Sequence, residues 1–364
     1  MQIATVLSHL ESIAPLSYQE SYDNAGLLTG QPDWECKGIL TTLDTTEAVV
    51  SEAAANGCNL IVSHHPLIFS GLKKITGANY VEKAVISAIR QDMAIYAIHT
   101  NLDHVPGGVN GRMAECLGLV NTRPLLPLER VLRKLICFVP TANLEQVRQA
   151  IFAAGAGHIG HYSECSWAVE GRGTFLGGAD TRPFVGKPGL RHEEPEMRLE
   201  VILPAWQSGR ILRAMIAAHP YEEVAYDLVD LANPHPSVGA GLVGELPEAL
   251  DERAFLDRLK TVFRTPVIRH TPLSGRPVKT CALCGGAGSS LISNALRANV
   301  DFYITADVKY HEFFDANDRL VIADIGHYES EQYTIDLLFD LLREKFPNFA
   351  VLKSAIATNP VNYY

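Results

Sequence analysis

The chain has 364 residues, of which 47% are hydrophobic and 20% charged, a composition typical of a folded globular protein with two or three domains. A formal net charge of -10 argues against a surface that follows phosphate backbones, so we expect no nucleic-acid partner. The sequence has no signal-peptide pattern and no apolar run of the roughly 18 residues that a membrane span requires, which excludes an integral membrane protein and predicts a cytoplasmic one.

The first third of the chain alternates helical and strand patterns. Apolar periodicity predicts a helix over 1–13, a strand over 38–43, a helix over 47–56, a strand over 59–63, a helix over 80–91 and a strand over 94–98. Strands that alternate with helices in this way form parallel sheets with crossover helices.

The middle of the chain has a different order of elements. The patterns predict a strand over 134–140, a helix over 143–157, extended chain over 165–176, a strand over 198–204, a helix over 206–220 and a strand over 223–231. This order is that of a ferredoxin-like βαββαβ domain. Its borders, PLLPLER and ANPHPSVGAG, are rich in Pro and Gly as linkers are, so we place an inserted domain at 128–235 between core halves at 1–127 and 236–364.

The last third returns to the α/β pattern of the first. We expect a strand over 278–283, a Gly-rich turn, a helix over 291–298, strands over 301–305 and 320–325, a long helix from about 331 to 345 and a strand over 350–354. Cys281 and Cys284 lie on the first of these strands, where residues three apart face opposite sides. No second such pair completes a zinc site, which favours buried structural cysteines.

The two outer thirds resemble each other in detail. The segment EAAANGCNLIVSHH aligns with NALRANVDFYITAD, and AIYAIHTNLD aligns with LVIADIGHYESE, in which each strand is followed by a His, three residues and an acid. We infer a duplicated α/β unit.

Polar residues that suit metal ions follow these strands. His64 and His65 end one strand directly, and Asp103 follows the next, so all three are expected at the carboxyl edge of one parallel sheet. Imidazoles and carboxylates together suit Zn, Fe or Mn. Taken alone, a His pair is more often a loop cap beside a solvated ring, and a lone acid more often makes a turn.

His327 and Glu331 occupy the equivalent position in the second half. Gly326 permits a sharp entry into a helix, on which residues four apart share one face. The alternative is that Glu331 merely stabilises a helix N-terminus. The duplication favours the metal hypothesis, because the two halves would bring three His and two acids to one cleft.

Five ligands exceed the needs of a four-coordinate structural zinc site, so we expect two ions about 3.5 to 4 Å apart. Further polar residues on the same edge are candidates for ligand support or substrate contact, with turn-making roles as the alternative: Asp44, His99, Asp307, Lys309 and His311. The Gly-rich loop at 285–290 could receive a phosphate, although it lacks the Lys of a P-loop.

With these residues identified, the chain resembles the GTP cyclohydrolase 1 type 2 homolog family, also called Nif-three-like or dinuclear metal centre hexameric proteins. The resemblance covers nearly the whole chain and rests on these motifs in order: YDNAGLLTG, LDTT, SHHPLIF, HTNLDHVPGGVN, CGGAGSSLI, TADVKYH and IGHYESE. Ala306 stands where the family usually has Gly. The middle segment resembles the PII/CutA-like insert of longer members, through GRGTFLGG and HPYEEVAYDL.

The resemblance implies a duplicated Nif-three-like α/β core with that insert, two divalent ions bound by His64, His65, Asp103, His327 and Glu331, and a toroidal homohexamer. Zinc is the expected metal, with Fe or Mn as alternatives. We expect a metal-dependent hydrolase that uses metal-activated water on an unidentified small molecule, for which a nucleotide or a cyclic amide is a candidate. The alternative is a metal-responsive binding or scaffold protein without catalysis.

Overall fold

The computed structural model describes all 364 residues, which divide into two compact units. One unit combines residues 1–127 with 237–364, and the other consists of residues 128–236. None of the helices is both long and apolar enough to cross a membrane.

The first sheet of the larger unit has five strands in the order β1-β4-β3-β2-β15. All neighbouring pairs are parallel except β1 with β4. The strands are β1 (Gly26–Thr29), β2 (Ile39–Thr42), β3 (Leu60–Ser63), β4 (Ala94–Ala97) and β15 (Val351–Lys353). The three central strands are buried at every residue, as expected for parallel strands covered on both faces.

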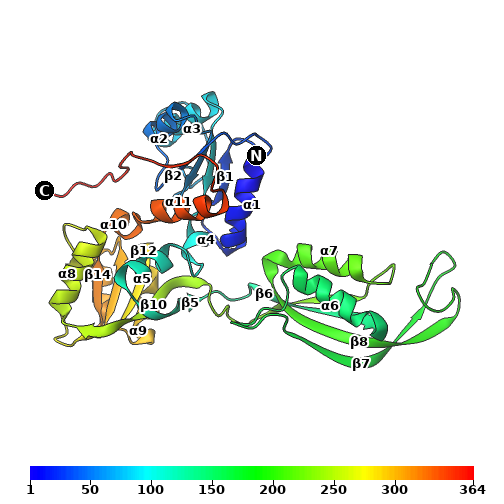
Figure 1. Ribbon diagram of the computed structural model, residues 1–364. Helices are drawn as coiled ribbons and strands as arrows, with labels where there is room; N and C mark the ends of the chain where they lie inside the picture. Colours follow the sequence, from blue (N-terminus) through cyan, green and yellow to red (C-terminus); the bar gives the residue numbers. More distant parts are fainter. The chain divides into compact units, whose positions relative to one another are not determined.

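Helices cover both faces of this sheet (Figure 1). On one face, Leu40 and Ile61 pack against the helices α2 (Glu47–Ala55) and α3 (Tyr80–Arg90). On the other, the hydroxyl of Tyr96 reaches Glu11 of α1 (Ile3–Ile13), and Thr41 contacts a carbonyl of α11 (Thr334–Lys345). A covered sheet leaves only the ends of its strands open to a ligand.

The second sheet of the same unit has six strands in the order β11-β14-β13-β12-β10-β5. The strands are β5 (Val120–Pro127), β10 (Gly239–Leu250), β11 (Arg269–His270), β12 (Val278–Ala287), β13 (Phe302–Ala306) and β14 (Val321–Asp324). The helices α5 (Val109–Leu117) and α8 (Glu252–Phe263) pack on one face, and α9 (Ile292–Ala298) packs on the other. Cys281 and Cys284 lie in different core clusters, on opposite faces of β12.

The two sheets repeat one arrangement, which confirms the duplicated α/β core. Strands β2, β3 and β4 are parallel neighbours with antiparallel β1 beside β4, and β12, β13 and β14 are parallel neighbours with antiparallel β11 beside β14. The carboxyl ends of β3 and β4, and those of β13 and β14, therefore carry equivalent segments.

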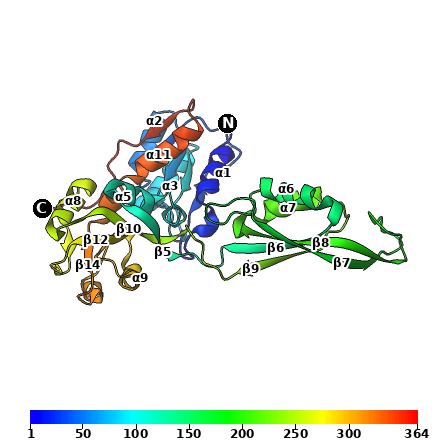
Figure 2. The ribbon, with the colours of Figure 1, turned by 60° about the horizontal axis from the view of Figure 1, so that its bottom comes forward.

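The smaller unit has the predicted ferredoxin-like order. Its sheet runs β7-β8-β6-β9 with every neighbouring pair antiparallel. The elements are β6 (Leu132–Pro140), α6 (Leu144–Ala153), β7 (Ser166–Leu176), β8 (Arg191–Pro204), α7 (Ser208–Ala218) and β9 (Tyr226–Leu231). Figure 2 shows α6 and α7 together on one face of this sheet.

Two local expectations differ from the structure. The segment PLLP, expected to be a linker, ends β5, which is an edge strand and therefore a place where a sheet tolerates proline. The helix expected from Glu331 is two helices, α10 (His327–Glu331) and α11. Between them, the side chains of Gln332 and Tyr333 donate to carbonyls of α8, which holds the chain at the break.

Candidate metal centre

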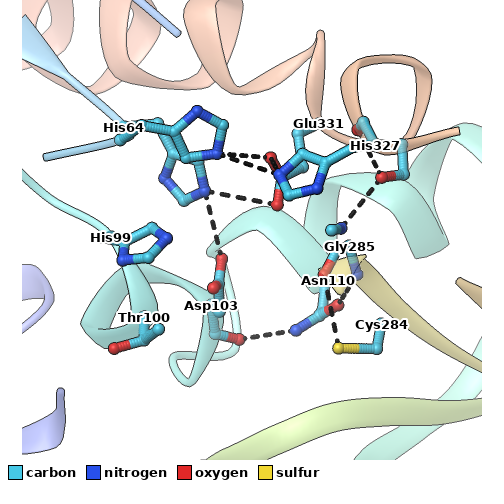
Figure 3. Close-up of polar contacts among 12 residues, drawn as sticks. His64, His99, Thr100, Asp103, Asn110, Cys284, Gly285, His327 and Glu331 are labelled. Atoms are coloured by element: carbon cyan, nitrogen blue, oxygen red, sulfur yellow. Dashed lines mark hydrogen bonds and ion pairs between the residues drawn. The ribbon is translucent and has the colours of Figure 1, made fainter. Parts of the chain in front are cut away.

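The five residues predicted as ligands lie together in the larger unit. His64 and His65 follow β3 directly, Asp103 ends the short helix α4 (Thr100–Asp103) after β4, and His327 and Glu331 begin and end α10 after β14. Figure 3 shows His64, Asp103, His327 and Glu331 with their polar atoms directed at one centre. Segments from both halves of the duplicated core thus form one cluster, which includes the three-residue group His65, His327 and Glu331.

Glu331 is the central carboxylate of this cluster and is only 3% exposed. Its Oε2 lies 2.9 Å from Nε2 of His65 and 3.2 Å from Nε2 of His327. Its Oε1 lies 3.6 Å from Nε2 of His64, which is itself 3.7 Å from Oδ1 of Asp103. The two oxygens of one carboxylate therefore face two different groups of nitrogen and oxygen atoms.

Each imidazole of the cluster is fixed through its Nδ1 atom. The Nδ1 of His65 is 2.7 Å from Asp44, that of His327 is 2.6 Å from Asp307, and that of His64 is 2.9 Å from the carbonyl of Ile98. Because carboxylate and carbonyl oxygens only accept, each Nδ1 is the donor. Its Nε2 then faces the centre, which is the usual arrangement of a metal-ligating histidine and its supporting acceptor.

His99 completes a second group of three imidazoles with His64 and His65. Its ring centroid lies 5.3 Å from that of His64 and 5.5 Å from that of His65. Asp23 accepts from its Nδ1 at 2.7 Å and also from the hydroxyl and amide of Thr100. Asp23 was not among the residues predicted from the sequence, although it lies in the motif YDNAGLLTG.

The electrostatics of the cluster follow from burial and pairing. Burial disfavours the charged form of His65, but hydrogen bonds to Asp44 and Glu331 outweigh it and raise its pKa to about 9. In the same way, Asp307 and Glu331 outweigh burial at His327 and raise its pKa to about 11. Burial would raise the pKa of Glu331, but His64 and the other imidazoles hold it well below its usual range.

His64 and Asp103 behave differently, because burial dominates at both. Burial lowers the pKa of the His64 imidazole and raises that of the Asp103 carboxyl well above its usual range. Nε2 of His64 and Oδ1 of Asp103 are buried and have no hydrogen-bond partner. A buried polar atom without a partner costs about 1 to 3 kcal/mol, so two that face each other fit a bound cation between them. The donor set of imidazole nitrogens and carboxylate oxygens suits Zn, Fe or Mn.

The Gly-rich loop makes room for these ligands. Gly286 has φ +61°, and a Cβ there would lie 2.4 Å from Oε1 of Glu331. The backbone N–H groups of Gly285, Gly286 and Gly288 donate to side chains: those of Asn110, Ser330 and Thr305 respectively. These three amides are therefore already bonded to the protein, and through them the loop is held beside the cluster.

The remaining candidates divide into two sets. Asp44 and Asp307 lie against ligand histidines, as described above. Lys309 and His311 are exposed residues at 3₁₀ helix η5 (Tyr310–Ala316) and do not line the cavity beside the cluster. Sequence reasoning also missed Thr358, whose hydroxyl donates to Asp44 at 2.6 Å, because nothing local marks a contact more than 300 residues away.

A cavity of about 840 Å³ opens beside the cluster. Its walls include His65, His99, Asp103, His327 and Glu331. The rim carries aromatic side chains and the C-terminal segment, namely Tyr22, Phe69, Tyr80, Asn359, Pro360, Val361 and Tyr363. The volume is that of an ordinary small-molecule site.

A family model described as Duf34/NIF3 (NGG1p interacting factor 3) matches residues 1–360. The chain belongs to the Duf34/NIF3 family. A GTP cyclohydrolase 1 type 2 homolog from Halalkalibacterium halodurans is 38% identical over 364 residues, covering 99% of this chain and 98% of that protein. One from Mycobacterium tuberculosis is 34% identical over 370 residues, covering 100% and 97%.

Solved structures of family members agree with this fold. A Bacillus cereus protein related to NIF3 superposes with a TM-score of 0.89 at 36% identity and covers 100% of this chain and 99% of that one. Staphylococcus aureus protein SA1388 gives a TM-score of 0.79 at 31% identity, again covering 100% and 99%. The likeness extends over both units, so the Duf34/NIF3 chain with its insert is one recurring architecture.

Proposed function

We propose that the protein is a metal-dependent hydrolase with a dinuclear centre held by His64, His65, Asp103, His327 and Glu331. The observation that carries the proposal is the buried Nε2 of His64 and Oδ1 of Asp103, 3.7 Å apart and without hydrogen-bond partners. A cation between these two atoms would satisfy both of them, and the Nε2 atoms of His65 and His327 face the same cluster of ligands.

The contacts divide the ligands into two sets. His64, Asp103 and Oε1 of Glu331 form one, and His65, His327 and Oε2 of Glu331 form the other. Glu331 would then help to hold both ions, for which zinc is the expected metal and Fe or Mn are the alternatives. Bound ions of this kind lower the pKa of a water molecule and polarise the group that it attacks.

The chain itself supplies proton handling and substrate space. His99 lines the cavity, and because its Nδ1 donates to Asp23, its Nε2 is free to accept a proton from a reacting group and return it. The cavity of about 840 Å³ is large enough for a nucleotide or a cyclic amide. These are the substrate classes we propose to screen, and GTP joins the panel because the relatives are named GTP cyclohydrolase 1 type 2 homologs.

The test uses protein loaded separately with Zn, Mn or Fe. We expect wild-type protein to retain two ions per chain, His64→Ala to retain one, and Glu331→Gln to lose both, because only Glu331 faces both ligand sets. Metal content is measured by elemental analysis after dialysis, beside the exposed control Asp33→Asn. Two ions retained by both ligand variants would refute the site.

Activity is a separate readout on the same proteins. Nucleotides, phosphoesters and cyclic amides are screened, and we expect turnover that both ligand variants and His99→Gln reduce. If the protein binds two ions but turns over no substrate class with any of the three metals, the hydrolase proposal is refuted. The alternative, a metal-responsive binding or scaffold protein, would then remain.

We also propose that the chain forms a homohexamer, as its family resemblance implies. Exposed aromatic side chains support an assembly surface: Tyr22 is 64% exposed, Tyr310 is 72% exposed and Phe314 is 66% exposed. Native mass spectrometry is expected to give six times the chain mass of 39.8 kDa, and a monomer would refute this proposal.

A further inference from the structure

A second cavity, of about 650 Å³, lies entirely within the smaller unit. Strands β7 and β8, the loop that joins them and the segment before β9 form its walls, and Figure 1 shows this hairpin extending past the helices α6 and α7. On β7, Ala168 packs in the core under the helices, so Val169 and Phe175 face the opposite side. The cavity therefore lies on the sheet face that the helices leave open.

One carboxylate is buried in this cavity. Glu196 is 8% exposed, and its Oε1 accepts a hydrogen bond of 2.8 Å from the hydroxyl of Tyr221. Its Oε2 lies against Gly173, where a Cβ would come within 2.0 Å of it. No Lys, Arg or His forms a salt bridge with Glu196. A buried carboxylate without a cation is unfavourable unless a ligand supplies the charge.

Aromatic rings surround the same carboxylate. The ring centroid of Tyr221 lies 6.4 Å from that of Phe175 and 6.3 Å from that of Phe184, and Phe138 also lines the cavity. Phe184 is 55% exposed although it is a large apolar side chain. Aromatic faces attract a cation that lies within about 6 Å of the ring centroid, and several rings together form a cage for ammonium groups.

The charges of the cavity wall favour a positive ligand. Its acidic residues are Glu170, Glu196, Glu222 and Glu223, and its basic residues are Arg172 and Arg198. Both arginines already pair outside the wall: Arg172 with Glu193, and Arg198 with Glu200 at 3.0 Å. The remaining field is negative and disfavours phosphates and carboxylates.

We propose that this cavity binds an organic cation, whose ammonium or guanidinium head group lies between the rings of Phe175, Phe184 and Tyr221 and against the carboxylate of Glu196. This site is separate from the metal centre, because all of its wall residues belong to the smaller unit. The ligand class follows from a buried carboxylate that has no salt-bridge partner, from the aromatic faces around it and from the excess of acidic over basic residues in the cavity wall.

The test is isothermal titration calorimetry on the full chain with three probes: choline, butylammonium and butylguanidinium. The uncharged control is 3,3-dimethyl-1-butanol, which has the shape of choline without its charge. We expect at least one cation to bind, and 3,3-dimethyl-1-butanol to bind about tenfold more weakly than the tightest cation, or worse, because cation–π and carboxylate contacts both need the charge.

Variants locate the binding. Glu196→Gln keeps an acceptor for Tyr221 but removes the charge, and we expect it to weaken cation binding about tenfold, whereas Glu145→Gln on α6 changes the net charge equally and leaves binding unchanged. Phe184→Leu tests the cage at an exposed position that does not endanger folding. Binding of no probe at millimolar concentration, equal binding of the uncharged analogue, or full binding by both Glu196→Gln and Phe184→Leu would each overturn the proposal.

Discussion

Replacing Asp44 with Asn should weaken metal binding without disturbing the fold. Asp44 accepts from Nδ1 of His65 at 2.7 Å and, through its other oxygen, from the hydroxyl of Thr358 at 2.6 Å. An Asn side chain can keep its carbonyl towards His65 and turn its amide to Thr358, whose hydroxyl also accepts. The hydrogen bonds survive, and only the negative charge behind His65 is lost.

The magnitude follows from what that charge does. It makes His65 a more basic ligand, as its raised pKa indicates, and loss of a supporting carboxylate behind a metal-bound His typically costs about 10- to 100-fold in affinity. This corresponds to about 1.4 to 2.7 kcal/mol. Only the ion held by His65 and His327 should be affected, so we expect a lower affinity for one of the two ions and an unchanged affinity for the other.

Competition with a chromophoric zinc chelator measures both affinities on metal-stripped protein. Asp307→Asn should weaken the same ion, because it supports His327 at 2.6 Å, whereas the exposed Asp33→Asn should leave both ions unchanged. Wild-type affinity for both ions in Asp44→Asn would refute the role of this carboxylate. Equal loss of both ions would refute the division into two ligand sets.

Two further predictions concern the scaffold. Gly286→Ala places a Cβ 2.4 Å from Oε1 of Glu331, so we expect this variant to lose metal as well as about 1 to 2 kcal/mol of stability. The control is Gly57→Ala, which also has a positive φ (+72°) but has nothing within 4 Å of its Cβ. It should lose stability only. Equal metal content in the two variants would contradict this. Glu82 accepts from the amides of Ala78 and Thr76 and from the Thr76 hydroxyl, which lower its pKa to about 2. Because the pKa of Glu82 is lower in the folded state, its charge stabilises the fold above the usual value near 4.5, and this stabilisation is lost as pH falls towards 2. The unfolding free energies of wild type and Glu82→Gln should therefore converge between those pH values. A constant difference in denaturant titrations would contradict the assignment.

Much of the fold could be predicted because its signals are local. The parallel strands have continuous apolar runs, and their helices follow within one crossover, so periodicity places β2, β3, β4, β13 and β14 to within about two residues. The strands β1, β10 and β11 were not predicted, and of these β1 and β11 are edge strands. Their sequences are short or interrupted by Gly, and their extended form depends on a partner strand far along the chain.

The amino-acid sequence by itself determined which residues end the strands of each half, because a buried parallel strand stops where polar side chains begin. It therefore identified His64, His65, Asp103, His327 and Glu331 and the repeat that relates them. Only the tertiary structure decided which oxygen of Glu331 faces which imidazole, that Asp23 fixes His99, and that the chain near its end reaches Asp44 through Thr358. These contacts join residues that come close only when the two halves of the core pack together. No local sequence pattern indicates how far apart such residues will lie in the folded chain.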